Sequence, residues 1–264
     1  TVAGTLSLGG LGAASHRFGT HLDNVESLEV VTGNGDLVEC SFEENRELFD
    51  SVRAGLGQFG IITRARLKLR PFSPNVRTFC LLYDDLQALM EDQTSILREQ
   101  RFDYIEGWCS PCMQGFKRVG ETRVPFSEWF YPVHLSVEFE DSPPSESILH
   151  DLNYYRCVHV EDYDLGSYLD RRSDLHELWR VSGEWQLPHP WMDVLLPWDQ
   201  AQQYIEGVLR SFPSHLLAGG QVVLRPCRGV ISEAPLFVHP EGEFVMGFGI
   251  LPAIQRQHLK MTLA

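Results

Sequence analysis

The clearest periodicity of the protein lies in its first 70 residues. Apolar and polar positions alternate over 25–31 and again over 59–69, which predicts two strands that each have one wet face. After the first strand, Asn34-Gly35 predicts a tight turn, and residues 37–40 predict a second strand running back along the first. Because Asn-Gly tolerates the positive φ of tight turns, this segment predicts a hairpin.

A helix is predicted between the hairpin and the second strand. It opens at Ser41, and Glu44 completes a capping box three residues later. An apolar face that includes Phe49 follows, and the helix ends at Gly55 or Gly57. The order of strand, hairpin, helix and strand indicates an α+β arrangement.

Beyond residue 70, strands and helices continue without strict alternation. Strands are predicted at 76–83, 103–109, 131–140, 221–227 and 243–250, and helices at 84–100, 143–152, 168–182, 199–212 and 253–264. This order favours an antiparallel sheet with helices on one face. The fold class is therefore α+β in both regions.

The sequence divides at Arg70-Pro71-Phe72-Ser73-Pro74, where two prolines interrupt the pattern. We predict two domains, 1–70 and 71–264. The first is near neutral, with 7 basic and 9 acidic residues, whereas the second holds most of the net charge of −14.

This charge balance excludes some classes of partner. An acidic protein without clustered cations does not suit a nucleic-acid backbone, and no uncharged stretch approaches the ~20 apolar residues of a membrane span. We expect neither nucleic acid nor membrane as a partner. The oligomeric state is not indicated.

Both ends of the sequence predict a fragment. The sequence starts at Thr1 without a basic or long apolar leader, so no signal peptide is indicated and a cytoplasmic location is slightly favoured. At the other end, an apolar helical pattern stops at Ala264. We expect sequence to be missing on both sides.

Cys109 and Cys112 are the only close pair among six cysteines. They are compatible with a redox dithiol or half of a zinc site, although no second pair or histidine set has the spacing of zinc ligands. The alternative is two ordinary cysteines around a proline turn. We predict no metal site.

Two glycine-dense segments are candidates for ligand contact. Residues 4–12 predict a loop whose backbone N–H groups approach an anion, helped by nearby hydroxyl groups, although an ordinary turn has the same composition. Residues 55–63 predict backbone pressed against a flat ligand, with Ile61 or Ile62 touching it. The alternative there is a helix stop followed by a bulged strand entry.

Taken in order, these segments resemble one family. The matching stretches are Thr1-Val2-x-Gly4-Thr5-Leu6-Ser7, Arg17-x-Gly19, Asn24-Val25, Val30-Val31-Thr32-Gly33, Glu43-Glu44-Asn45 and Gly55-Leu56-Gly57-Gln58-Phe59-Gly60-Ile61-Ile62. They resemble FAD-linked oxidoreductases of the vanillyl-alcohol oxidase fold, and among these the cytokinin dehydrogenases. Two later segments, 102–107 and 185–193, resemble the substrate domain of the same family.

The resemblance implies the second part of a PCMH-type FAD-binding domain followed by a substrate (cap) domain. It implies FAD as the cofactor and a small N6-substituted adenine as the substrate, in which the C–N bond of the N6 substituent is oxidised by hydride transfer to flavin N5. The cofactor-binding residues implied are Thr1, Gly4, Thr5, Ser7, Leu11, Gly60 and Ile62, and the substrate residues are Trp191 and Asp193.

Departures from the family pattern leave alternatives open. The aspartate that the family uses as a base precedes the segment matching Thr1, so we name no catalytic residue and expect no independent catalysis by these 264 residues. Phe18 replaces a histidine, Ala3 a glycine and Asp193 an asparagine. A carboxylate cannot donate a hydrogen bond as an amide does, so an alcohol, sugar or lactone donor is an alternative, as is a non-catalytic remnant.

Overall fold

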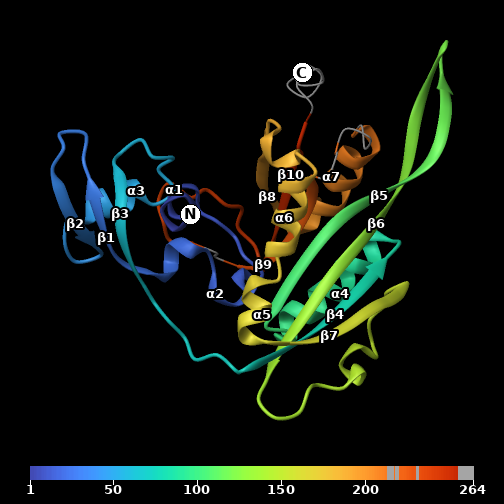
Figure 1. The fold of residues 1–264 in the computed structure, drawn as a ribbon, viewed down its shortest axis with the longest axis horizontal. Coiled ribbons are helices and arrows are strands. Elements are labelled where there is room, and N and C mark those ends of the chain that lie inside the picture. The colour runs from blue at the N-terminus through green and yellow to red at the C-terminus, as the bar shows by residue number, and fades with distance from the viewer. Residues whose placement is uncertain (213–216, 218–219, 230–231, 255–264) are drawn as a thin grey trace. The chain divides into compact units, whose positions relative to one another are not determined.

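The computed structural model describes residues 1–212, 217, 220–229 and 232–254 (Figure 1). The protein consists of two compact units. Unit 1 comprises Thr1–Phe72 and Arg225–Val245, and unit 2 comprises Ser73–Leu224 and Met246–Ala264. The first division lies two residues beyond the predicted one, but the predicted range 71–264 did not separate the segment that returns to unit 1.

Hydrogen bonds and packing explain why this segment belongs to unit 1. The Asp23 carboxylate accepts hydrogen bonds from the Ser232 hydroxyl and the Glu233 backbone N–H. Ala234 is buried in the core of unit 1 together with residues from the first 62 positions. These contacts join positions more than 200 residues apart, and local sequence patterns do not reveal such pairings.

Unit 1 contains a small antiparallel sheet in the order β2-β1-β3. The strands are β1 (Val25–Val31), β2 (Leu37–Ser41) and β3 (Ile61–Leu67), and the helices are α1 (Val2–Leu8), α2 (Ser15–Phe18), η1 (His21–Asn24) and α3 (Arg46–Val52). The predicted hairpin is confirmed: the Thr32 N–H donates to Asp36 O, and Gly35 has φ of 90°.

The loop predicted over 4–12 is wrong for residues 4–8, because Val2–Leu8 is the helix α1. The Thr1 hydroxyl caps this helix by accepting from the Gly4 N–H, and Gly9 ends it in the left-handed conformation. The N–H groups of Thr5 and Gly9 are bonded inside the helix or its cap. They are therefore not available to an anion.

The helix predicted to begin at Ser41 begins later. The Ser41 hydroxyl accepts from the N–H groups of Glu43 and Glu44, which closes a turn before α3. Asn45, in the left-handed conformation, then leads into the helix, which ends at Val52 rather than at a glycine. A serine that bonds the backbone locally favours a turn as readily as a helix start.

Unit 2 is built on a seven-stranded sheet in the order β7-β4-β6-β5-β9-β10-β8. Its strands are β4 (Asn75–Tyr83), β5 (Tyr104–Val119), β6 (Thr122–Phe139), β7 (Arg156–Asp164), β8 (Met192–Pro197), β9 (Gln221–Arg228) and β10 (Phe244–Leu251). The pairs β4–β6, β4–β7, β5–β6 and β5–β9 are antiparallel. The α+β fold class with antiparallel sheets is thus confirmed.

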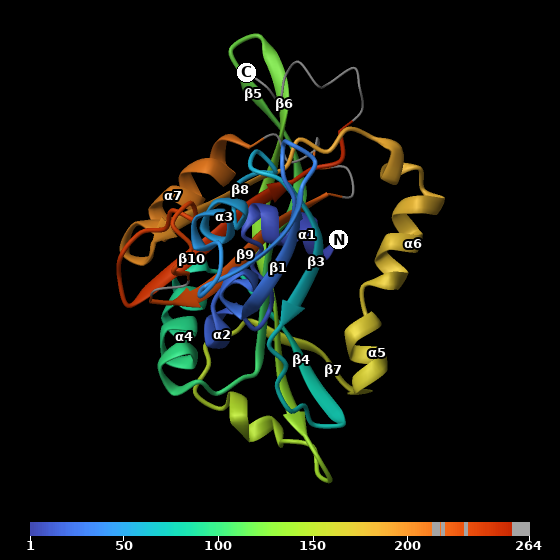
Figure 2. The same cartoon turned by 90° about the vertical axis from the view of Figure 1, so that its left-hand side faces the viewer.

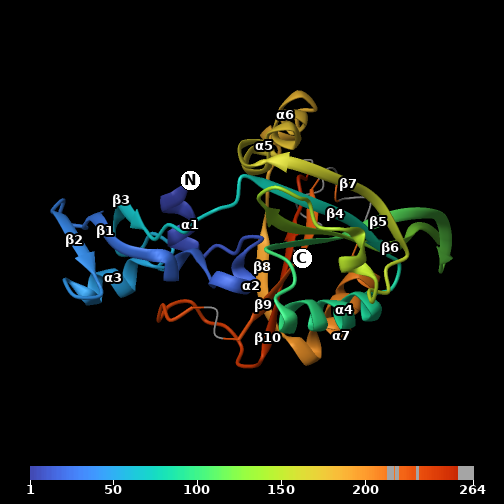
Figure 3. The same cartoon turned by 90° about the horizontal axis from the view of Figure 1, so that it is seen from below.

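Helices lie on both sides of this sheet (Figures 2 and 3). The helices of unit 2 are α4 (Leu86–Glu99), η2 (Glu146–Leu149), α5 (Leu165–Asp170), α6 (Ser173–Val181), η3 (Glu184–Gln186) and α7 (Trp198–Ser211). The expected cover on one face is formed by α4 and α7, whereas α5 and α6 lie on the opposite side.

The layer between the sheet and α4 is a hydrophobic core. Phe79 and Leu135 are fully buried there, and Tyr83 donates a hydrogen bond to Asp92 of α4. On the same side, Phe248 of β10 makes an edge-to-face contact with Tyr204 of α7. Because successive side chains of a strand point to opposite faces, the residues next to these in the strands point away from α4 and α7.

The strands β5 and β6 are much longer than predicted. The pairing of β5 with β9 covers Gly107–Cys109, and that of β6 with β4 covers Tyr131–Phe139. Farther out, β5 and β6 pair only with each other among the described residues and project from the sheet (Figure 1). We call this outer part, residues 111–130, the ribbon.

Several other predictions are corrected. The helix predicted over 143–152 is the short 3₁₀ helix η2, the helix predicted over 168–182 is interrupted at Arg171 and Arg172, and β7 and β8 were not predicted. The helix predicted at 253–264 falls mainly on 255–264, outside the described residues. No helix in the described part of the protein has the length and apolar character needed to cross a membrane.

Candidate functional site

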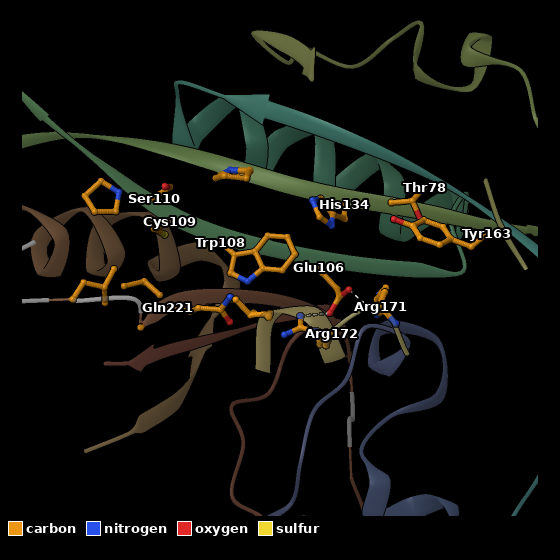
Figure 4. Close-up of a pocket in the computed structure, with 16 residues that line it drawn as sticks. Thr78, Glu106, Trp108, Cys109, Ser110, His134, Tyr163, Arg171, Arg172 and Gln221 are labelled. Atoms are coloured by element: carbon orange, nitrogen blue, oxygen red, sulfur yellow. Dashed lines mark hydrogen bonds and ion pairs between the residues drawn. The ribbon is translucent and has the colours of Figure 1, made fainter. Parts of the chain in front are cut away.

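The face of the unit 2 sheet opposite α4 and α7 holds a cavity of about 430 Å³ (Figure 4). Its floor is formed by β4, β5, β6 and β9, and its wall by β7 and the junction of α5 with α6. The polar and aromatic residues that line it are Thr78, Glu106, Trp108, Ser110, His134, Tyr163, Arg171, Arg172 and Gln221.

Glu106 is the central charged group of this cavity. It lies on β5 opposite His134 of β6, and its side chain is only 13% exposed. Arg171 Nη2 donates to Glu106 Oε2 at 2.7 Å, and Arg172 Nη2 donates to Glu106 Oε1 at 2.5 Å. Each carboxylate oxygen thus has its own arginine.

These contacts determine the ionisation of Glu106. Burial alone would raise the pKa of a carboxyl group, but the charges and hydrogen bonds of Arg172 and Arg171 outweigh burial and hold the pKa of Glu106 below its ordinary value. Burial lowers the pKa of His134, and both arginines lower it further, against the opposite effect of Glu106. At neutral pH the cavity therefore contains a carboxylate anion beside a neutral imidazole.

Trp108 gives the cavity a flat apolar wall. Its ring contacts His134 edge-to-face, with centroids 4.7 Å apart, and the Arg172 guanidinium lies 5.8 Å from its centroid. The indole N–H is buried and has no hydrogen-bond partner among the residues that the structure describes. An aromatic wall, an ionised acceptor and an unused N–H donor suit a planar, nitrogen-containing ligand.

The two predicted substrate residues lie outside this lining, Asp193 on the same face of the sheet and Trp191 just before β8. Trp191 is 56% exposed and contacts His189 edge-to-face. Asp193 lies on β8, with its carboxylate over Gly249 of β10, so that a Cβ on Gly249 would overlap Asp193 Oδ1. The same Cβ would also overlap Val223 of β9. Val223 pairs with Trp108 of β5, so Asp193 lies on the face of the sheet that holds the cavity.

Of the predicted cofactor-binding residues, Thr5 lines a cavity in unit 1. This cavity has a volume of about 450 Å³ and is also lined by Gly12, Thr20, Lys68 and Arg70, among others. Hydroxyl, backbone and cationic donors of this kind suit an anionic group. Thr1 and Gly4 lie at the start of α1, next to Val2, which also lines the cavity.

The other predicted cofactor residues have structural roles in unit 1. Ser7 O accepts from the Leu56 N–H, which brings the two glycine-dense segments together. A Cβ on Gly60 would lie 2.5 Å from Val30 Cγ1, so glycine is needed there for close packing on β1. Ile62 is buried in the core, and Leu11 is half-buried. These positions leave the prediction of FAD contacts untested.

Sequence reasoning missed the principal residues of the cavity. The segment 102–107 matches a strand of the substrate domain, but the sequence assigns Glu106 no role, and Arg171-Arg172 falls inside a predicted helix. The available signal was two adjacent arginines in a strongly acidic region. Their relation to Glu106, 65 and 66 residues away, depends on the tertiary fold.

The cysteine pair lies in the strand β5, not around a turn. Cys109 is buried and Cys112 is exposed, and both are free thiols. Burial raises the pKa of the Cys109 thiol, which makes it unreactive. Among the described residues no cluster of three histidine, cysteine or carboxylate side chains could hold a metal ion.

Comparisons with known proteins agree with the sequence resemblance. Residues 130–262 match the family model described as "Cytokinin dehydrogenase 1, FAD and cytokinin binding". The protein is 37% identical over 241 residues to "Uncharacterized oxidoreductase ORF5 in fasciation locus" of Rhodococcoides fascians, a match that covers 91% of this sequence and 53% of that protein.

Plant proteins are also similar. Identity is 33% over 234 residues with cytokinin dehydrogenase 1 of Arabidopsis thaliana, covering 80% of this sequence and 40% of the relative. It is 33% over 237 residues with cytokinin dehydrogenase 6 of Oryza sativa subsp. japonica, covering 80% and 45%. The 264 residues thus span about half the length of these relatives. The prediction of FAD as the cofactor is confirmed for the family.

Proposed function

The protein belongs to the cytokinin dehydrogenase family, and we propose that it forms part of an FAD-dependent oxidoreductase that oxidises the C–N bond of the N6 substituent in N6-substituted adenines. One observation carries this proposal. Most residues that line the unit 2 cavity, including His134 and Arg171, lie within the stretch 130–262 that matches the FAD and cytokinin-binding family model. The cavity is thus the substrate site proposed here.

The chemistry of the cavity suits this substrate. An adenine ring is planar and carries both hydrogen-bond donors and acceptors. Trp108 offers an apolar face and an N–H donor, while the Glu106 carboxylate accepts from a ring or exocyclic N–H. We propose that Asp193, on the same face of the sheet, and Trp191, just before β8, contact the remainder of the substrate.

FAD fits the residues of unit 1 in part. The cavity lined by Thr5, Gly12, Lys68 and Arg70 has donors for a phosphate-bearing ligand, and Gly10 leaves room for Thr5, since a Cβ there would lie 2.5 Å from Thr5 Cγ2. We propose that Thr1, Gly4, Ser7, Leu11, Gly60 and Ile62 help to hold FAD. When bound, FAD supplies the hydride acceptor.

The remaining steps depend on the protein and on water. The cavity would hold the adenine through its aromatic wall and its carboxylate acceptor. Loss of a hydride from this carbon and of a proton from the nitrogen gives an imine, which water hydrolyses to adenine and an aldehyde. The neutral imidazole of His134 faces the cavity, where it can accept a hydrogen bond from the ligand.

The test is oxidation of N6-isopentenyladenine by the full-length parent protein with FAD and a dye acceptor, with adenine and the aldehyde measured as products. Dye reduction without adenine release would contradict the proposal. The 264-residue protein is assayed in parallel for retained flavin absorbance, and we expect no turnover from it alone.

A second donor class is suggested by Asp193. A carboxylate at this position accepts hydrogen bonds but cannot donate them, and it therefore also suits a hydroxyl-bearing substrate. Alcohols, sugars and lactones are tested in the same dye assay. Turnover of one of these, without turnover of N6-isopentenyladenine, would replace the adenine substrate by that class.

A further inference from the structure

The two arginines at the cavity wall share an unusual position. Arg171 is the C-cap residue after α5 and Arg172 the N-cap residue before α6, so the short link between two helices supplies both guanidinium groups. Each also lies on an aromatic ring: Arg171 is 4.1 Å from the Tyr168 centroid, and Arg172 is 5.8 Å from that of Trp108. The link is thereby held over the Glu106 carboxylate (Figure 4).

The two arginines determine which hydrogen bonds the Glu106 carboxylate can still accept. Each carboxylate oxygen has two acceptor sites, and one arginine occupies one site on each oxygen. Because the cavity adjoins this carboxylate, the remaining sites are open to a ligand. If Glu106 were protonated, one of its oxygens would instead donate a hydrogen bond.

We propose that Arg171 and Arg172 are positioning residues, which hold Glu106 as an anion turned into the cavity and so restrict the ligand to one that presents an N–H donor. The part of this inference that concerns the ligand rests on the function proposed above. Neither arginine is required to touch the substrate.

Other ionisable groups surround Glu106 and share its environment. They are Tyr104 on β5, His134 and Glu138 on β6, His159 on β7 and Tyr168 on α5. Burial raises the pKa of Tyr168 to about 12, so this residue stays neutral in the experiment. Of the groups that face the carboxylate, the two arginines are the ones that favour its charged form most strongly.

The first measurement follows the ionisation of Glu106 directly. The Cδ carboxyl carbon of glutamate is labelled with ¹³C and its NMR shift is recorded against pH, with the signal assigned by its loss in Glu106→Gln. We expect wild-type Glu106 to titrate below an ordinary glutamate. In the double variant Arg171→Gln/Arg172→Gln we expect the titration to move upward by about 1–3 pH units, the usual effect of a close opposite charge.

Two further variants separate the effect of the arginine charges on Glu106 from an effect of the substitutions on the fold. Arg171→Lys/Arg172→Lys keeps both charges and should keep the low titration, even if the helices shift. Arg180→Gln removes one arginine of α6 that pairs with Glu177 on the surface, and it should leave Glu106 unchanged. If the glutamine pair fails to fold, Arg172→Gln alone should show an upward shift of the same sign.

The second measurement concerns the ligand. The dissociation constant of N6-isopentenyladenine is measured by calorimetry from pH 5 to pH 8. We expect a flat profile for the wild type and for Arg180→Gln. In the glutamine pair, binding should weaken at least about tenfold toward pH 5, because Glu106 then becomes protonated and loses acceptor sites.

The outcomes are distinguishable. An ordinary or raised titration of wild-type Glu106, or one that the glutamine pair does not change, would overturn the positioning role. The expected titrations without any binding of N6-isopentenyladenine by the wild type would contradict the proposed substrate while leaving the assignment of the arginines intact. A pH-dependent affinity in the wild type like that of the glutamine pair would overturn the inference about the ligand.

Discussion

The two faces of the unit 2 sheet are formed by alternate residues of the same strands, yet they have different chemistry. On one face, the paired residues Phe79 and Leu135 are fully buried, on the same side as Tyr83 and its partner Asp92 of α4. On the other face, the neighbouring positions Cys80 and His134 lie on the side of the cavity, with Glu106. A strand with period two can therefore build a core and a polar site at once.

This comparison also shows how the polar face is stabilised. The core face relies on non-directional apolar burial, for which many side chains are interchangeable. The cavity face relies on a few directed contacts, such as those of Arg171 and Arg172 with Glu106. Substitutions on the two faces should thus differ in both size and pH dependence.

The largest effect is expected on the core face. Phe79→Ala removes a fully buried ring and should lower the free energy of unfolding by about 3–5 kcal/mol. Cys80→Ala, one position along and on the opposite face, should change it by less than about 1 kcal/mol. Urea denaturation of both variants measures the difference, and equal losses would contradict the division between faces.

The next effect is expected at Glu106 and depends on pH. Glu106→Gln removes two charge-assisted hydrogen bonds and should cost about 1.5–3 kcal/mol at pH 7. Because the folded pKa is lower than the unfolded one, this stabilisation is fully present above the ordinary value of 4.5 and is lost as the pH falls through the folded pKa. Unfolding curves of both proteins from pH 7 downward should converge.

A smaller effect is expected where the cavity face is tightly packed. A Cβ in Gly249→Ala would overlap Asp193 Oδ1 and would meet Val223 Cγ2 at 2.8 Å. Asp193 must then move, and we expect a loss of about 1–3 kcal/mol by urea denaturation. An unchanged midpoint would show that the Asp193 carboxylate does not occupy the space above Gly249.

The smallest effect is expected on the helix that covers the core face. Gly207 lies inside α7, and a Cβ there would meet nothing within 4 Å. Gly207→Ala should therefore raise the free energy of unfolding by about 0.5–1 kcal/mol, through helix propensity. Thermal unfolding measures the gain, and it provides a glycine control for Gly249→Ala.

Elements with a strong apolar pattern can be predicted from the sequence, and weakly patterned ones cannot. The prediction of β1 has the observed bounds and that of β4 lies within one residue, because both strands are rich in apolar residues that are buried. β7 is an edge strand whose side chains are mostly exposed, so its sequence lacks the alternation that marks a half-buried strand. The ribbon contains Pro111 and Pro125, which argue against a strand locally.

The candidate site could be predicted only in its chemical class. The resemblance indicated FAD and two substrate-domain segments, 102–107 and 185–193, all from local motifs. The cavity is formed by residues from β4 to β9, and the pairing of Glu106 with Arg171 and Arg172 depends on how the α5–α6 link crosses the sheet. Such long-range juxtapositions have no signature in one sequence.

The ribbon has a consequence for the motions of the protein. Over 131–136, β6 has a neighbouring strand on each side, whereas at 122–130 it pairs only with β5 among the described residues. Amide hydrogens within one continuous strand should therefore exchange with deuterium at very different rates, slowly near Val133 and rapidly near Val124. The two strands that form the floor of the cavity thus continue into a ribbon whose outer amides we expect to be less protected than those of the floor.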